Sequence, residues 1–203
     1  MKRFAVKAAL SFALVLMVLT TLHGQVSDDA FFIPLTSAQS EVMDQQLDLS
    51  QLPPGVDIGT PDVYQLQSAH ADYLAVVPIH FDYGDTPQPS DALPSQCGAF
   101  FVKANGQSHY LPIVGPDFAN SPGLCGGVGE VGATLDPGPR PRLIFFFTIW
   151  TAHPGDDFDE PFVLSWNKAS GAYEVDKKTS DWVVQQRKSD TAYQVQKLLA
   201  HHH

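Results

Sequence analysis

Apolar and polar residues alternate along several stretches of this chain downstream of Val63, which is the period-two pattern of half-buried β-strands. In residues 77–84 every second residue is apolar and large, and the Pro78 inside this run favours an edge strand. Residues 143–150 have the sequence LIFFFTIW and are almost continuously apolar. They predict a central strand that is covered on both faces.

Two turn signals predict β-hairpins. Asn105-Gly106, between AFFVKA and QSHYLPI, is the residue pair that a two-residue type I′ turn prefers. Such a turn would pair Val102 with His109 and would place four side chains on one face: Phe100, Val102, His109 and Leu111. Residues 168–171, with the sequence Lys-Ala-Ser-Gly, predict a second hairpin within residues 162–176.

A helical period appears in two segments, one before residue 50 and one near the C-terminal end of the sequence. Residues 36–47 predict a short helix capped by Thr36 or Ser37, and residues 190–200 predict a helix capped by Ser189. The second helix has an apolar stripe that would pack on a sheet, formed by Ala192, Val195, Leu198 and Leu199. We therefore expect a mainly β fold, an antiparallel sheet or small sandwich built from hairpins, with a C-terminal helix and one disulfide.

The N-terminus has the layout of a secretory signal peptide. Basic residues precede the apolar run of residues 8–22, and Gly24 offers a small residue for cleavage before Gln25. The run is short for a membrane span, which needs about 20 residues, although an uncleaved signal anchor is the alternative. We expect residues 1–24 to be a signal peptide, residues 25–60 a polar, loosely ordered N-terminal arm, and residues 61–200 a single β-rich domain. The mature protein is expected to be secreted or periplasmic, with no membrane insertion after cleavage near Gly24.

Cys97 and Cys125 are the two cysteines of the chain, and both lie in the part expected to be exported. An even number of cysteines in an oxidising compartment predicts a disulfide rather than a pair of metal ligands.

The charge of the chain is strongly negative and unevenly distributed. Removing residues 1–24 takes away three basic residues and no acidic one, which leaves nine basic against 22 acidic residues and changes the net charge from −10 to −13. From Gln25 to Val102 there are eleven carboxylates and no Lys or Arg. Such a surface repels phosphate and anionic lipid, so we expect no nucleic-acid partner and no membrane surface as partner.

The stretch CGGVGEVG contains the spacing G-x-G-x-x-G in Gly127, Gly129 and Gly132. A dinucleotide-binding turn needs a strand before it and a helix after it, but prolines follow these glycines and forbid that helix. We expect no cofactor here, and interpret the glycines as positions where a strand bends or packs closely beside the disulfide.

Four histidine and aspartate residues are candidate catalytic groups: His80, Asp82, His109 and His153. His80 and Asp82 lie two apart on a strand, so they point to the same side at about 6–7 Å and resemble a base with its orienting acid or two metal ligands. A solvated strand face is the simpler interpretation of that pair. A hydrogen-bonded core position is the simpler interpretation of His109.

A cluster of carboxylates follows His153 and is a candidate calcium site: Asp156, Asp157, Asp159 and Glu160. Calcium takes six to eight oxygen ligands, but the spacing of a calcium-binding EF-hand loop is absent, which favours a solvated loop between two strands and no metal.

No motif of a known catalytic class occurs in the chain. We therefore expect an exported soluble non-enzymatic binding protein for a protein or envelope component, and in its most specific form an inhibitor or immunity-type protein for a basic partner. One alternative is a secreted hydrolase or metal-dependent enzyme that uses the candidate histidines. The other is a structural or calcium-stabilised envelope module. The oligomeric state is left open.

Overall fold

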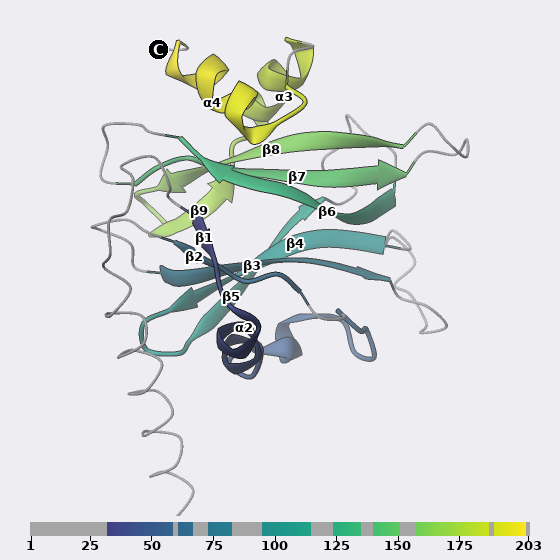
Figure 1. Ribbon diagram of the computed structural model, residues 1–203, viewed down its shortest axis with the longest axis vertical. Helices are drawn as coiled ribbons and strands as arrows, with labels where there is room; N and C mark the ends of the chain where they lie inside the picture. Colours follow the sequence, from purple (N-terminus) through teal and green to yellow (C-terminus); the bar gives the residue numbers. More distant parts are fainter. Residues whose placement is uncertain are drawn as a thin grey trace, which may run out of the picture.

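The computed structural model describes residues 32–58, 61–66, 73–82, 95–114, 124–134, 140–150, 157–186 and 189–201. Two antiparallel sheets lie one above the other, and helices cover the outer face of each (Figure 1). The first sheet has the order β1 (Phe32–Pro34), β2 (Tyr64–Leu66), β3 (Tyr73–Asp82), β4 (Ser95–Lys103) and β5 (Ser108–Val114). The second sheet has the order β6 (Leu124–Ala133), β7 (Leu143–Trp150), β8 (Phe158–Asn167) and β9 (Ala172–Val175). The predicted fold class is confirmed, whereas the expected signal peptide lies outside the described residues.

Three apolar clusters hold these layers together. The largest lies between the two sheets and includes Phe101, Phe145 and Phe147. The second lies under the first sheet, where α2 (Ser37–Asp44) and the 3₁₀ helix η1 (Leu49–Gln51) cover it. The third lies between the second sheet and the helices α3 (Lys177–Gln185) and α4 (Ala192–Ala200). Within the described ranges, none of these helices is long and apolar enough to cross a membrane.

Strand β7 is the central strand that its sequence predicts. It pairs with β6 on one side and β8 on the other. Its residues alternate between the two apolar clusters, with Phe145 in the cluster between the sheets and Phe146 in the cluster under the helices. The near-continuous apolar sequence follows from burial on both faces.

Strand β3 is an internal strand, so the prediction of an edge strand is wrong. It pairs with β4 along its length, and β2 pairs with it only through Ala75 and Val76. Pro78 lies beyond the end of β2. The missing N–H of Pro78 therefore interrupts no contact with β2, which explains how a proline is accommodated inside this sheet.

The hairpin between β4 and β5 forms where Asn105-Gly106 predicts it, but in another register. The amide of Lys103 donates to the carbonyl of Gln107, and Gly106 has a φ of 80°, so the loop has three residues with Gly106 in the left-handed region. His109 consequently pairs with Phe101 instead of Val102. The predicted shared face of Phe100, Val102, His109 and Leu111 is therefore wrong, because Phe100 and Val102 face α2 while Leu111 faces the second sheet.

The terminal segments are more ordered than their polar sequences suggest. Helix α2 begins after Thr36, as predicted, and Met43, Leu47 and Leu52 are buried under the first sheet. This packing differs from the expected loosely ordered arm for the described part of residues 25–60. The predicted C-terminal helix is confirmed as α4, with Thr191 as its cap in place of Ser189. Helix α3 was not predicted.

Candidate functional site

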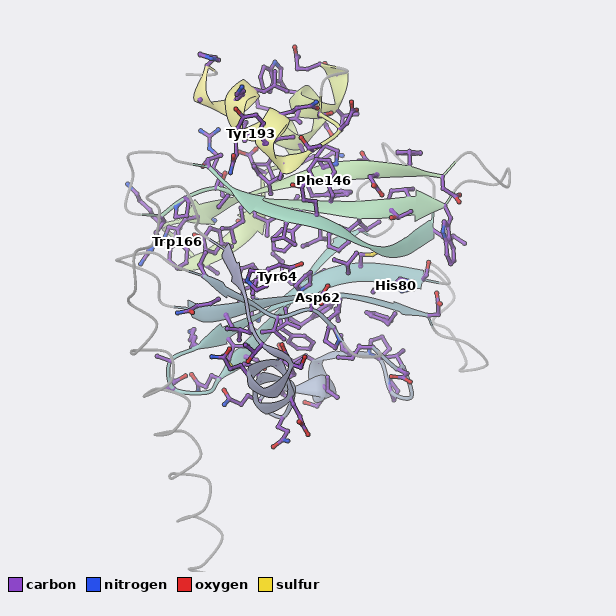
Figure 2. The ribbon with its side chains drawn as sticks, in the orientation of Figure 1. Asp62, Tyr64, His80, Phe146, Trp166 and Tyr193 are labelled. Atoms are coloured by element: carbon purple, nitrogen blue, oxygen red, sulfur yellow. A yellow bond between two sulfur atoms is a disulfide. The ribbon has the colours of Figure 1, made fainter. Side chains whose placement is uncertain are left out.

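His80 lies at one end of the sandwich, where the described parts of β3 and β7 end (Figure 2). The prediction that His80 and Asp82 point to one side is confirmed, with Nε2 of His80 3.5 Å from Oδ1 of Asp82. The geometry of this contact is not that of a hydrogen bond, and in the described part of the chain the buried Nε2 has no hydrogen-bond partner. The imidazole meets the ring of Trp150 edge to face at a centroid distance of 6.3 Å. His80 thus lies against an aromatic side chain, whereas Asp82 is exposed to solvent.

Ser95 also lies at this end of the sandwich, and no motif in the sequence predicts it there. Asp82 pairs with Ser95 and His80 with Cys97 across the β3–β4 ladder, so His80, Asp82 and Ser95 share one face. The side chain of Ser95 is buried, and its Oγ has no hydrogen-bond partner among the described residues. Ser95 reaches this position through the pairing of β4 with β3, two strands that residues 83–94 separate in the sequence.

The other catalytic candidates do not join this group in the described part of the chain. His109 is exposed in β5, close to the opposite end of the sandwich, so the expectation of a core histidine is wrong. Its position follows from the three-residue hairpin loop. His153 lies outside the described residues, and the hydrolase alternative stays a prediction.

The acidic residues after His153 do not all lie in a loop, because β8 begins at Phe158. Asp159 is exposed and accepts a hydrogen bond of 2.7 Å from Oγ1 of Thr148, whereas Glu160 is buried. Neighbouring residues in a strand point to opposite faces, so Asp159 and Glu160 of β8 lie on opposite sides of the sheet. Among the described residues no three His, Cys, Asp or Glu side chains form a group that could hold a metal ion, and Asp156 lies outside them.

The glycine-rich stretch forms the extended strand β6 and not a turn before a helix. A β-carbon on Gly126 would collide with the indole of Trp150, and one on Gly132 would lie 2.6 Å from the β-carbon of Ala192. Cys125, in the same strand, forms the disulfide with Cys97 of β4 at a Cα–Cα distance of 5.7 Å. Of the three glycines interpreted as positions of close packing, Gly132 packs tightly against Ala192 and Gly129 lies close to Phe146, whereas a β-carbon on Gly127, the one nearest the disulfide, would meet nothing within 4 Å. Close packing therefore accounts for Gly129 and Gly132 but not for Gly127.

Charge is segregated between the two halves of the sandwich. The described residues of α2, η1 and the first sheet, 32–114, contain six carboxylates and one basic residue, Lys103. The described residues of the second sheet and its helices, 124–201, contain eight carboxylates and six basic residues. Five carboxylate residues of the first half are exposed: Glu41, Asp48, Asp57, Asp62 and Asp82. We call the half formed by residues 32–114 the acidic layer.

The acidic layer contains an open cavity of about 300 Å³ beside η1, lined mostly by apolar residues. Its lining is drawn from one segment of the chain: Leu49, Leu52, Pro53, Pro54, Gly55, Val56, Asp57, Ile58 and Pro61. Leu49 is 51% exposed and Leu52 is buried, so the lining runs from solvent to the core. The polar sequence around Leu52 predicts a loosely ordered arm, and such an arm gives no reason to expect a cavity.

Asp48, at the start of η1, carries a stabilised negative charge. Its carboxylate accepts hydrogen bonds from the hydroxyl and backbone N–H of Ser50 and from the amide of Gln51. The hydroxyl of Ser50 is the main cause that lowers the pKa of Asp48 below its usual value, and the other two hydrogen bonds add to it. The group therefore stays ionised at neutral pH.

No protein-family model, curated protein or solved structure matches this chain.

Proposed function

We propose that this protein is an exported, non-enzymatic binding protein whose acidic layer engages a basic protein partner. The observation that carries the proposal is the segregation of charge, since one half of the sandwich has six described carboxylates against one lysine. A surface with one sign of charge attracts a partner of opposite sign and speeds their encounter. In its most specific form, the proposal describes an inhibitor or immunity-type protein that covers a basic active site.

The β5 edge of the first sheet supports binding through side chains rather than through strand pairing. Gln51 lies along this edge, where it accepts a hydrogen bond from the N–H of Tyr110 and donates one to the carbonyl of Ser108. At this edge a partner would therefore meet a side chain in place of these two backbone groups.

A matched pair of variants tests the proposal. The acidic-layer variant combines Glu41→Gln, Asp57→Asn and Asp62→Asn, and the control variant combines Asp157→Asn, Asp181→Asn and Asp190→Asn in the other half. Both remove three negative charges, so the two variants have the same net charge and differ only in where the charge is lost. None of the six replaced residues is buried.

The experiment is an affinity capture with residues 25–203 immobilised at 20 and 150 mM NaCl, using exported proteins of the source organism. The proposal expects the capture of basic proteins that, once purified, bind the control variant normally and the acidic-layer variant at least about tenfold more weakly. Capture of no basic protein, or equal binding to both variants, would contradict it.

A further inference from the structure

We propose that the cavity beside η1 is the anchoring site of the acidic layer, and that it takes one large apolar side chain from a basic segment of the partner. This inference rests on the proposed function and adds the position and chemistry of the contact. The volume of about 300 Å³ is at the lower end of the range for ligand sites and leaves ample room for one Leu, Met or Phe side chain.

The wall of the cavity is fixed to the first sheet before any partner arrives. The backbone N–H of Asp48 donates to Oγ of Ser108 at 2.7 Å, and the Gln51 amide contacts Ser108 and Tyr110 at 3.0 and 2.9 Å. Leu52 anchors the same segment in the apolar cluster under the sheet. A preformed wall lowers the entropy that a ligand must lose on binding.

The rim of the cavity supplies the charge that selects a basic segment. Asp57 is exposed and belongs to the lining, while the exposed residues Asp48 and Asp62 lie next to lining residues in the chain. Lys103 is the single basic residue among the described residues of this layer, and it lies at the start of the β4–β5 hairpin loop. An apolar side chain flanked by Lys or Arg therefore complements the cavity in both shape and charge.

Charge also argues against the occupants that this chain itself could provide. Residues 25–31, directly before β1, contain Asp28 and Asp29 and no basic residue. A second acidic layer would face the first with the same sign of charge. The C-terminal helix, which carries Lys197, lies on the far side of the second sheet (Figure 1). The occupant is consequently a basic segment of another protein.

The test uses three labelled peptides as probes: Lys-Lys-Phe-Lys-Lys, Lys-Lys-Gly-Lys-Lys and Glu-Glu-Phe-Glu-Glu. They are titrated into ¹⁵N-labelled residues 25–203 at 20 mM NaCl. The inference expects the first peptide to shift the amide resonances of Leu49, Val56 and Asp57. It also expects this peptide to bind at least about fivefold more tightly than either of the others.

Leu49→Ser is the matching variant, since Leu49 is half exposed and its replacement removes apolar rim without opening the core. It should weaken binding of the phenylalanine peptide at least about fivefold, whereas Tyr193→Ser, at a 60% exposed position on α4, should change it less than twofold. Figure 2 shows Tyr193 on the helix layer, away from Asp62.

Three results would overturn the inference: equal affinity of the two lysine peptides, shifts confined to other parts of the protein, or no binding at 1 mM peptide. If both lysine peptides bind the wild type equally and neither binds the acidic-layer variant, the proposed function is supported and the cavity is not the anchoring site. The capture experiment replaces no apolar residue of the cavity. A failure of the proposed function in that experiment can therefore be distinguished from a failure of the cavity inference in the peptide titration.

Discussion

At the scale of single residues, Gly132 controls how closely α4 approaches the second sheet. The change Gly132→Ala would place a β-carbon 2.6 Å from that of Ala192, so either the helix or the strand must move. We expect a loss of about 1–3 kcal/mol in the free energy of unfolding, as for an overpacked core. Denaturant unfolding followed by circular dichroism measures it.

Gly127 provides the matched control in the same strand. A β-carbon on Gly127 would have no heavy atom within 4 Å, and its φ is not positive. Gly127→Ala should change the free energy of unfolding by less than about 0.5 kcal/mol. If both variants unfold alike, close packing is not the reason for the glycines of β6.

Asp176 links α3 to β8 and predicts a pH dependence. Burial would raise the pKa of Asp176, but hydrogen bonds from the N–H and hydroxyl of Thr179 and from the hydroxyl of Ser165, together with Arg142, outweigh burial and lower it. A carboxyl with a lowered pKa stabilises the fold above its unfolded-state pKa of 3.8, and this contribution is lost as the pH falls through the lower folded-state value.

Asp176→Ala should therefore cost about 1–2 kcal/mol at pH 7, as expected for a helix cap. The difference from the wild type should stay constant from pH 7 to 5 and shrink as the pH falls below 3.8. Thermal unfolding across this pH series is the measurement, with Asp157→Ala as control. A difference that grows on acidification would contradict the assignment.

At the scale of elements, η1 protects an edge of the first sheet. Residues two apart in a strand direct their backbone groups to the same side, so Ser108, Tyr110 and Pro112 of β5 all face the outer edge. Gln51 bonds the carbonyl of Ser108 and the N–H of Tyr110, and Pro112 has no N–H to offer. Together they leave fewer backbone groups on this edge for another strand to pair with.

Gln51→Ala should open this edge. We expect a loss of about 1–2 kcal/mol from the two hydrogen bonds and increased self-association, visible as a concentration-dependent rise in sedimentation coefficient. Gln45→Ala, an exposed change at the end of α2, serves as control. A variant that stays as monodisperse as this control would show that Gln51 does not protect β5.

The elements also show how far local sequence reaches. The apolar run of residues 143–150 predicts β7 correctly because burial on both faces leaves a direct trace in composition. Asn105-Gly106 predicts the hairpin, but the same dipeptide fits a loop of two or three residues, and that one-residue difference moves His109 to the other face. Ser95 lies beside His80 and Asp82 because β4 pairs with β3. Residues 83–94 separate the two strands in the sequence, so local patterns do not predict this pairing.

At the scale of the whole molecule, the Cys97–Cys125 disulfide connects the two sheets, since Cys97 lies in β4 and Cys125 in β6. It closes a segment with a sequence separation of 28 residues, which on the chain-entropy model stabilises the fold by about 3–4 kcal/mol. The double variant Cys97→Ala/Cys125→Ala should lose that amount in denaturant unfolding. An unchanged midpoint would show that the sheets do not depend on this covalent link.

The charge segregation could be predicted from the sequence because the chain builds one sheet after the other. All strands of the first sheet precede Gly115, and all strands of the second sheet follow Gly123. The segment of residues 25–102, which has no basic residue, therefore becomes most of one layer. The cavity beside η1 could not be predicted, because its lining segment is rich in proline and has only scattered apolar residues, a pattern that is typical of a loop.

The affinity of a purified basic partner for the acidic-layer variant and for the control variant, measured from 20 to 200 mM NaCl, tests the central claim most directly. We predict that the acidic-layer variant binds at least about tenfold more weakly at low salt and depends less on salt, while the control variant matches the wild type. Equal affinities and equal salt dependence of the two variants would contradict the claim that this layer is the binding surface.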